Sequence, residues 1–392
     1  MRILVAAASF AANISGVQRH ALNLARCLLA QPEIRSVFFV VAPWQRALMD
    51  AAALAPDSRL TPYEVEMPRH AAGRNAWYYR ALPQLARKLQ ADVVHLTCPM
   101  PVNAAAYPCP TVVTLHDLYP CEIPMNFGFP KFLFNRIVLQ QCLRSADAIA
   151  CVSDATRMGL GRYFPKYSRK AVRVYNCVEP DPAGEESPIA CWHGEPFLLA
   201  IAQHRRNKNI PLLVRTYDRL LDLKRIPSAT KLVVVGINGP ETPSLHRLVA
   251  KRGLAGRIHF LEGLSEAELR WCYRHCEALV TPSITEGFGL PVAEGLLAGC
   301  RIICSDIPAH REIGEDRCTF VRLGDDAEEE LAVAICAALR IPKPQPIVLP
   351  QLTAAVLGEQ YAGLYRQLIA ASARTSAVAP PAVVAATERR TL

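Results

Sequence analysis

The most informative stretch of the 392-residue chain reads TPSITEGFGLPVAEG and covers residues 281–295. Directly before it, residues 277–280 are apolar enough to form a short buried strand. Gly287 and Gly289 predict a tight loop whose backbone can pass close to a ligand. Pro291 suits the first turn of a helix, which the small apolar residues after it continue. The stretch therefore predicts a strand, a glycine loop and a helix N-terminus, an arrangement that suits an anion such as phosphate.

Two carboxylates frame this stretch, Glu286 on the loop and Glu294 one turn into the helix. A carboxylate repels a phosphate, so we expect their partners to be hydroxyl groups, which carboxylates bind through short, strong hydrogen bonds. A site that offers backbone amides to a phosphate and carboxylates to hydroxyls suits a nucleotide sugar. The alternative is a capped surface helix whose glutamates have no ligand.

The length and composition indicate a globular protein of two domains. A chain of 392 residues exceeds one ordinary core. Hydrophobic residues make up 51% and charged residues 20%, which argues against a mainly disordered chain. Short apolar runs alternate with helical patterns in both halves, which indicates two doubly wound parallel sheets of the α/β class. Ligands bind beyond the carboxyl ends of such strands, so we expect the two sheets to face each other across a cleft.

We expect a first Rossmann-like domain over residues 1–180 and a second, which binds the nucleotide sugar, over 195–345. The polar, proline-rich segment 179–188 would link them. Residues 352–370 fit one long helix, and the Ala/Pro/Ser/Thr-rich residues 371–392 a disordered tail. The strands are expected at residues 3–6, 36–41, 92–96, 111–116, 148–152, 197–202, 231–235, 258–261, 277–280, 301–304 and 319–321.

The net charge of +9 lies in the first half, because residues 1–180 hold 20 Lys and Arg against 11 Asp and Glu. A basic half indicates an anionic partner, such as a membrane surface, a phosphorylated acceptor or nucleic acid, unless the charge serves only solubility. The helix expected over residues 75–89 mixes aromatic and basic side chains and suits a membrane interface, although a partly buried helix with charged edges also fits. No apolar run reaches the roughly 18 residues of a membrane span.

The 14 cysteines contain no Cys-x-x-Cys pair, and no Cys/His cluster has the spacing of a zinc site. Residues 1–14 resemble a first buried strand and its loop more than a cleavable signal. We therefore expect free thiols and a cytoplasmic protein that carries no metal.

Further candidate residues follow predicted strands. Gly16 comes after the first strand, where it either admits a phosphate or sugar or makes a simple turn; the Gly-x-Gly-x-x-Gly fingerprint of NAD-binding proteins is absent. Arg205, Arg206 and Lys208 follow the first strand of the second half, and such a basic cluster either clamps a diphosphate or is a solvated charge run. His116 ends a strand, where it contacts a sugar hydroxyl, transfers a proton or is structural.

The sequence EGFGLPVAEG, in which seven residues separate Glu286 from Glu294, resembles the signature of family 4 retaining glycosyltransferases, which have the GT-B fold. The resemblance covers about residues 1–370. Supporting matches lie at residues 113–118, 152–156, Asn176, 298–308 and 312–314.

The resemblance implies a donor diphosphate held by Lys208 together with Arg205 or Arg206. The Gly-Arg pair that is common in the family at this strand end is replaced here by Ala202-Gln203, which leaves the choice of arginine open.

The resemblance also implies roles for the other candidates. Glu286 would bind hydroxyls of the transferred sugar near the reacting centre, and Glu294 the ribose hydroxyls. Gly16 would let the N-terminal loop approach the diphosphate, and His116 would line the acceptor side. The remaining donor-binding backbone would come from Gly287, Phe288, Gly289 and Leu290.

The implied reaction is retaining transfer of a hexose without a covalent intermediate, a cofactor or an essential metal, since Arg/Lys charge and the helix dipole stabilise the leaving diphosphate. Mannose from GDP-mannose is the first expectation and a UDP-hexose the second. The acceptor would be a glycan or a lipid-linked saccharide of a surface polysaccharide or lipopolysaccharide. The basic first half would contact the inner face of a membrane and bind no nucleic acid. The alternatives are a nucleotide-sugar epimerase, a glycan phosphorylase, or a non-enzymatic protein that binds anionic surfaces.

Overall fold

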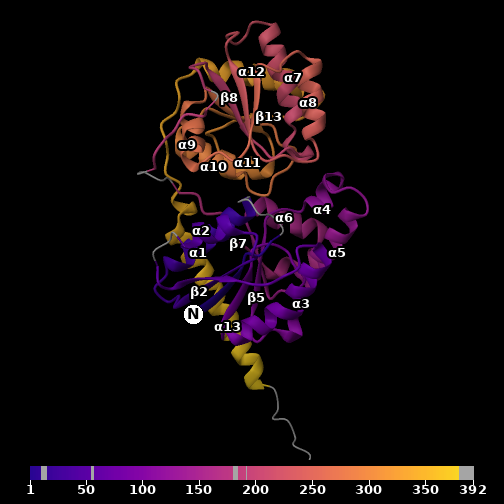
Figure 1. Ribbon diagram of the computed structural model, residues 1–392, viewed down its shortest axis with the longest axis vertical. Coiled ribbons are helices and arrows are strands. Elements are labelled where there is room, and N and C mark those ends of the chain that lie inside the picture. Colours follow the sequence, from indigo (N-terminus) through magenta and orange to yellow (C-terminus); the bar gives the residue numbers. More distant parts are fainter. Residues whose placement is uncertain (10–15, 54–56, 180–183, 191, 379–392) are drawn as a thin grey trace, which may run out of the picture.

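The computed structural model describes residues 1–9, 16–53, 57–179, 184–190 and 192–378. The described chain forms two α/β domains stacked along the long axis of the molecule (Figure 1). Residues 10–15 of the loop expected after the first strand lie outside the described residues. No described helix is long and apolar enough to cross a membrane.

The first domain contains a seven-stranded, all-parallel sheet in the order β3-β2-β1-β4-β5-β6-β7. Its strands are β1 (Arg2–Ala6), β2 (Ser36–Val41), β3 (Leu60–Glu64), β4 (Val93–Leu96), β5 (Thr111–Leu115), β6 (Ala148–Cys151) and β7 (Ala171–Arg173). Its helices are α1 (Gly16–Leu29), α2 (Arg46–Ala53), α3 (Ala71–Lys88), α4 (Tyr119–Glu122), α5 (Lys131–Ser145) and α6 (Asp154–Tyr163). Three short 3-10 helices join them, η1 (Ala104–Ala106), η2 (Pro124–Asn126) and η3 (Pro165–Lys170).

The second domain contains a six-stranded parallel sheet in the order β10-β9-β8-β11-β12-β13. Its strands are β8 (Phe197–Ile201), β9 (Lys231–Val235), β10 (Ile258–Leu261), β11 (Ala278–Thr281), β12 (Ile302–Ser305) and β13 (Thr319–Val321). Its helices are α7 (Ile210–Asp222), α8 (Thr242–Lys251), α9 (Glu266–His275), α10 (Leu290–Ala298), α11 (Pro308–Gly314) and α12 (Ala327–Arg340), with the 3-10 helices η4 (Arg206–Lys208) and η5 (Pro350–Leu352).

Both sheets are covered by helices on both faces, and alternate residues of one strand face opposite layers. In β1, Ile3 and Val5 pack with α1, whereas Leu4 and Ala6 pack on the side of α3 and α5. Each expected strand is present. The two that the apolar runs did not predict, β3 and β7, lie at the two edges of the first sheet. Both are only partly buried, so they carry no continuous apolar run, and the edge position tolerates Pro62.

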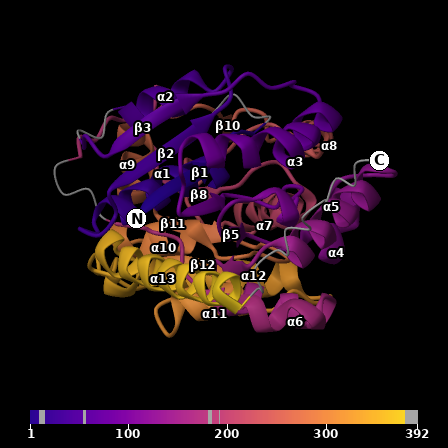
Figure 2. The same cartoon turned by 90° about the horizontal axis from the view of Figure 1, so that it is seen from below.

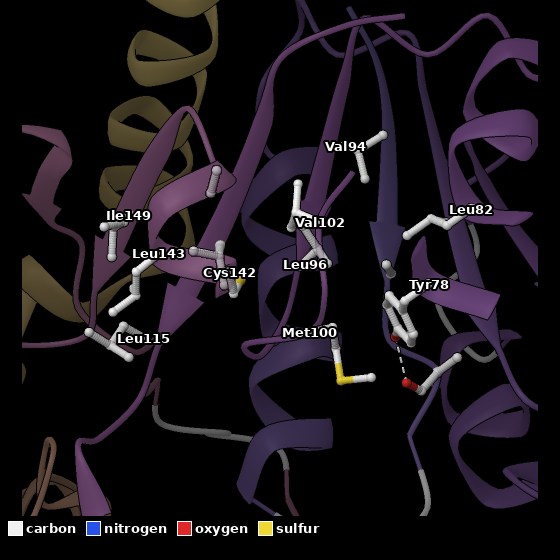
Figure 3. Packing of buried hydrophobic residues seen from close by; sticks show 14 of the residues in the cluster. Tyr78, Leu82, Val94, Leu96, Met100, Val102, Leu115, Cys142, Leu143 and Ile149 are labelled. Carbon is white, nitrogen blue, oxygen red and sulfur yellow. Dashed lines mark hydrogen bonds between the residues drawn. The ribbon is translucent and has the colours of Figure 1, made fainter. Parts of the chain in front are cut away.

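Helix α3 belongs to the core of the first domain. Its buried side chains Tyr78, Leu82 and Ala86 recur every four residues, the spacing of one helix face. The Tyr78 hydroxyl donates a 2.6 Å hydrogen bond to the carbonyl oxygen of Ala8 (Figure 3). The helix expected over residues 75–89 is therefore partly buried, as one of the two alternatives predicted, and its contact with a membrane stays a prediction.

Helix α13 (Ala354–Val378) leaves the second domain and packs along the first (Figures 1 and 2). It lies so close to α1 that a Cβ atom at Gly358 would come within 2.1 Å of the Cys27 carbonyl oxygen. The helix runs past residue 370, so residues 371–378, which we expected in a disordered tail, are helical. The reason is that no glycine or proline lies between Gly363 and Pro380. Residues 379–392 of the expected tail lie outside the described part of the chain.

The two domains meet at the glycine loop between β11 and α10. The Gly287 carbonyl oxygen accepts hydrogen bonds from the hydroxyls of Ser153, at 2.5 Å, and Thr156, at 2.9 Å, both at the start of α6. A Cβ atom on Gly287 would lie 1.6 Å from the carbonyl oxygen of His116. Only glycine therefore fits this position while the domains are in contact.

A carboxylate reinforces the same contact from α11. Glu312 accepts hydrogen bonds from the backbone amides of Asp154, at 2.7 Å, and Ala155, at 2.9 Å. These amides belong to the first turn of α6, which has no intrahelical partners for them and carries the positive end of the helix dipole. The second domain thus caps a helix of the first domain.

We expect Gly287→Ala to separate the domains, because the added methyl group overlaps a backbone oxygen that cannot move alone. Small-angle X-ray scattering should show a larger radius of gyration, while the circular dichroism of the two folded domains is unchanged. Gly324→Ala is the matched control, since nothing lies within 4 Å of a Cβ atom there. An unaltered scattering profile for Gly287→Ala would refute the contact.

Candidate active site

The glycine loop has the strand, loop and helix arrangement expected from the sequence. Strand β11 ends at Thr281, and α10 begins at Leu290 with Pro291 in its first turn. Gly289 occupies the N-cap position with φ of 93°, a conformation that favours glycine. The first amides of α10 have no intrahelical acceptor and lie beside the domain contact. The loop therefore presents backbone donors next to Glu286.

Glu286 lies between the two domains and bonds to both. Its Oε1 atom is 2.5 Å from the ammonium of Lys208, and its Oε2 atom accepts a 3.1 Å hydrogen bond from the Tyr119 hydroxyl. Only 8% of its side chain is exposed. Burial by itself raises the pKa of Glu286, but the charges of Lys208 and His310 and the hydrogen bond from Lys208 outweigh burial and lower that pKa below its usual value. Glu286 is therefore ionised at neutral pH.

The basic cluster after β8 separates into buried and exposed members. Lys208 ends η4 and reaches Glu286, whereas Arg206 points into solvent. Arg205 is partly buried, and its charge opposes the rise that burial causes in the pKa of Asp117 in the first domain. Its buried Nε–H group has no hydrogen-bond acceptor among the described residues. Arg205 and Lys208 are thus the members of this basic cluster that lie at the domain contact.

Glu294 lies in α10 and is mostly buried, with 20% of its side chain exposed. Its Oε2 atom accepts a 2.5 Å hydrogen bond from the Tyr273 hydroxyl, and its Oε1 atom lies 3.7 Å from an Arg19 nitrogen. Burial raises the pKa of Glu294, and the Arg19 charge opposes that rise. Arg19 extends from α1 of the first domain and also pairs with Glu266 at 2.6 Å. Glu294 therefore faces a cation from the opposite domain.

Gly16 begins α1, one turn before Arg19. A Cβ atom at this position would meet nothing within 4 Å, so packing within the described chain does not require glycine. This differs from Gly287, where the neighbouring domain excludes any side chain.

His116 lies at the contact but is held by the first domain. Its Nε2–H group donates a 2.7 Å hydrogen bond to the Thr97 carbonyl oxygen. The centroids of the His20 and His116 rings lie 4.7 Å apart, and the ring planes are nearly perpendicular. Burial lowers the pKa of His116 to about 4, although the Thr97 hydrogen bond opposes this. The imidazole is therefore neutral at physiological pH, and its ring is fixed in orientation.

A buried polar chain connects α13 to this region. The Tyr365 hydroxyl lies 2.5 Å from His95 Nδ1, and the Thr114 hydroxyl lies 2.8 Å from His95 Nε2. Thr114 also lies 3.1 Å from His20 Nε2, and His20 Nδ1 lies 2.9 Å from Asn176 Oδ1. The Asn176 side-chain oxygen can only accept a hydrogen bond, so only one assignment of donors satisfies the whole chain. In it, each group from the Tyr365 hydroxyl onward donates to the next group towards Asn176, and both histidines are neutral.

Sequence reasoning missed several residues that contact the predicted site from the first domain. Tyr119 bonds to Glu286, Glu122 accepts a 3.1 Å hydrogen bond from Thr285, and Arg19 faces Glu294. No local pattern marks them, because their role depends on the packing of one domain against the other. Among the described residues, no group of three His, Cys, Asp or Glu side chains is arranged to hold a metal ion, and every described cysteine is a free thiol.

Asp117 is the other carboxylate of the first domain at this contact. Its Oδ1 atom accepts a 3.1 Å hydrogen bond from the Tyr119 amide. Burial raises the pKa of Asp117 to about 6, and the charges of Glu122 and Glu286 add to the rise, whereas that of Arg205 opposes it. The chain thus retains an acidic side chain where its ionisation is unfavourable, which is typical of functional sites.

We expect Asp117→Asn to stabilise the protein above pH 6. Because the pKa of Asp117 is higher in the folded state, its contribution to the free energy of unfolding falls as pH rises from about 4 to 6 and stays lost above that. Asparagine does not ionise, so the variant does not lose stability as the pH rises. Its side-chain oxygen can still accept the hydrogen bond from the Tyr119 amide. Its gain in free energy of unfolding should be small at pH 4 and about 2–3 kcal/mol at pH 8.

Urea unfolding at several pH values measures this difference. Asp316→Asn, at an exposed position of the second domain, is the control and should show little pH-dependent gain. A variant Asp117→Asn that is less stable than the native chain at pH 8 would contradict the assignment.

Two family models match the chain, one for each domain. The model described as "Glycosyltransferase Family 4" matches residues 14–182, and that described as "Glycosyl transferases group 1" matches residues 188–345. Together they account for most of both domains.

The curated relatives include several mannosyltransferases. The chain is 26% identical over 255 residues to the O-antigen chain mannosyltransferase RfbU of Salmonella typhimurium, a match that covers 65% of this chain and 66% of the relative. It is 27% identical over 219 residues to the O-antigen chain mannosyltransferase B of Escherichia coli, covering 52% and 55% of the two chains. The chain therefore spans somewhat less than two thirds of the length of these relatives.

Solved structures match over nearly the whole chain. Anabaena HepE in complex with UDP-glucose has a TM-score of 0.64 at 16% identity, covering 96% of this chain and 100% of that one. WaaG, a glycosyltransferase involved in lipopolysaccharide biosynthesis, has a TM-score of 0.63 at 17% identity, covering 96% and 99%. These likenesses concern the fold alone. Family models match both domains, and the two parallel sheets have the arrangement of the GT-B fold. The chain therefore belongs to glycosyltransferase family 4.

Proposed function

We propose that the chain transfers a hexose from a sugar nucleotide to a glycan or lipid-linked saccharide, with retention of configuration at the anomeric carbon. The observation that carries the proposal is the 2.5 Å contact between Glu286 and Lys208 at the carboxyl ends of the second sheet. There a carboxylate, two cations and the N-terminus of α10 meet side chains of the first domain. This combination suits a ligand that carries both hydroxyls and a diphosphate.

In this proposal Lys208 and Arg205 bind the donor diphosphate. Arg205 is preferred over Arg206 because it is partly buried and has an unpaired Nε–H group, whereas Arg206 is exposed. The amides from Gly287 to Leu290 add backbone donors and the positive end of the helix dipole. A diphosphate that reaches Lys208 shares the ammonium with Glu286, so the two anionic groups are held by one cation.

Glu286 binds hydroxyls of the transferred sugar, and its lowered pKa keeps it an acceptor at neutral pH. Glu294 binds the ribose hydroxyls, with the Tyr273 hydroxyl fixing the orientation of its carboxylate. Ribose binding there would take the place of the longer 3.7 Å contact with Arg19. His116, fixed and neutral, lines the acceptor side, and Gly16 gives the N-terminal loop room to approach the diphosphate.

The reaction breaks the bond between the anomeric carbon and the diphosphate oxygen, and both electrons of that bond leave with the diphosphate. An acceptor hydroxyl forms the new bond from the same face, and its proton passes to an oxygen of the leaving phosphate. Lys208, Arg205 and the α10 dipole stabilise the charge that develops on the diphosphate. We propose that this requires neither a cofactor nor a metal, and that Glu286 forms no covalent intermediate.

Mannose from GDP-mannose is the first donor that we propose, supported by the two O-antigen mannosyltransferases among the relatives. A UDP-hexose is the second, supported by the fold likeness to HepE with UDP-glucose. The acceptor belongs to a surface polysaccharide or lipopolysaccharide, and the protein works in the cytoplasm at the inner face of the membrane, with no role for nucleic acid. A nucleotide-sugar epimerase, in contrast, would release an altered sugar without any acceptor.

A panel of GDP- and UDP-sugars tests the proposal by thermal shift. The true donor at about a hundredfold its Kd should stabilise the native chain by about 2.7 kcal/mol. Lys208→Ala should weaken donor binding by about tenfold or more, because a hydrogen bond to a charged group contributes about 1.5–3 kcal/mol. Lys251→Ala, an exposed lysine of the same domain, should bind the donor as the native chain does.

Product analysis completes the test. With the donor identified, nuclear magnetic resonance should show an axial-for-axial or equatorial-for-equatorial product at the anomeric carbon. Failure of every sugar nucleotide to stabilise the native chain, or release of an epimerised sugar without an acceptor, would contradict the proposed function. A glycosyl ester trapped on Glu286 would contradict the mechanism.

A further inference from the structure

Exposed apolar side chains gather on one short segment of the first domain. The described residues include 14 exposed large hydrophobic side chains, and five of them fall between residues 125 and 137. We call these five residues the α5 surface: Met125, Phe129, Leu133, Phe134 and Ile137. Phe129 is 84% exposed and Met125 70% exposed, so the described part of the chain does not bury them. Single exposed apolar residues are ordinary, but a local group of them marks an interaction site.

The α5 surface is one continuous feature of the backbone. Leu133, Phe134 and Ile137 share one face of α5, at spacings of one and four residues. Phe129 precedes the helix, and its ring lies 6.4 Å from that of Phe132. The opposite face of α5 buries Leu139, Cys142 and Leu143 in the core of the domain (Figure 3). Helix α5 therefore uses one face for folding and leaves the other apolar face in solvent.

The charged residues of this segment are all positive. Lys131, Arg136 and Arg144 are exposed on the same helix. Residues 123–146 contain no Asp or Glu. The nearest acidic residue before them, Glu122, is directed to Thr285 of the second domain. Aromatic and aliphatic side chains flanked by Lys and Arg are the combination that enters the headgroup region of an anionic bilayer.

The same segment forms part of the candidate active site. Helix α4 and η2 lie immediately before α5 and touch the second domain, where Tyr119 bonds to Glu286 and Asn126 bonds to Asn207 at 3.1 Å. Both views show α4 and α5 together at one edge of the first domain (Figures 1 and 2). A partner that binds the α5 surface would therefore lie next to the acceptor side of the site.

We propose that the α5 surface binds the headgroup region of an anionic lipid bilayer and so places the acceptor side of the site at the membrane. A protein partner fits less well, since stable protein interfaces use about 20–30 residues a side and the apolar group here has five. Helix α3, the other aromatic and basic helix, uses Tyr78 and Leu82 in the core. The placement of a lipid-linked acceptor at the site rests on the proposed function, whereas the binding of the α5 surface to a bilayer does not.

Co-sedimentation of the full chain with vesicles tests the inference. Vesicles of equal parts phosphatidylglycerol and phosphatidylcholine should bind the native chain, and Leu133→Glu with Ile137→Glu should lower that binding at least tenfold. Lys131→Glu with Arg136→Glu should abolish the preference for phosphatidylglycerol and the sensitivity to salt. Val333→Glu with Ile341→Glu, at similarly exposed apolar positions of the second domain, should bind as the native chain does.

Three results would overturn the inference. These are a native chain that does not bind the anionic vesicles at low salt, equal binding by the Leu133/Ile137 and Val333/Ile341 variants, and a native dimer in sedimentation velocity that the Leu133/Ile137 variant breaks. Thermal shift with sugar nucleotides keeps the two proposals apart. Donor stabilisation retained in the Leu133/Ile137 variant shows that it is folded, and vesicle binding without any donor stabilisation would uphold the surface while removing the proposed function.

Discussion

The structure depends on the contact between the backbone of Gly287 and the carbonyl oxygen of His116. A Cβ atom at 1.6 Å from that oxygen is impossible, so the absence of a side chain sets how closely the two sheets approach. Two hydroxyls at the start of α6 hold the Gly287 carbonyl oxygen, and Glu312 caps the same helix from the second domain. Every functional group of the candidate site is positioned relative to this contact.

The pKa values of the carboxylates at the contact shift in different directions because their surroundings differ. Glu286 is buried beside an ammonium, so its pKa is lowered, whereas Asp117 is buried near two other carboxylates, so its pKa is raised to about 6. The pKa of Glu294 is also raised, because its cation is farther away. Burial is the largest single effect on the pKa of Glu286, and Lys208 together with the other partners of Glu286 outweighs it. A permanently ionised group suits hydroxyl binding in a reaction that develops negative charge on a nearby diphosphate, and Lys208 keeps Glu286 ionised.

The sequence predicted what repeats or is local, and it missed what depends on contact between distant segments. Both sheets were predictable because their central strands are buried on both faces and read as apolar runs; the edge strands β3 and β7 are not, and they were missed. The loop with Glu286 and the Lys208 cluster were predictable from glycine spacing and charge. Tyr119 and Arg19 were not, because an exposed-looking tyrosine and arginine acquire partners only across the domain contact. The end of α13 was misplaced because an alanine-rich composition was taken for disorder although it lacks a helix breaker.

Helix α13 makes the two domains less independent than a two-domain chain suggests. It follows the second domain in sequence but buries Tyr361 and Tyr365 in the first, where Tyr365 begins the polar chain through His95 and Thr114 to His20. That chain is buried, so each member needs its partner, and loss of one leaves a donor or acceptor unsatisfied. His20 packs edge-on against His116, whose carbonyl oxygen meets Gly287. The buried residues that anchor α13 and those that contact the glycine loop are therefore connected. A substitution of Tyr365 in α13 would disturb the part of the first domain that packs against the loop of Glu286.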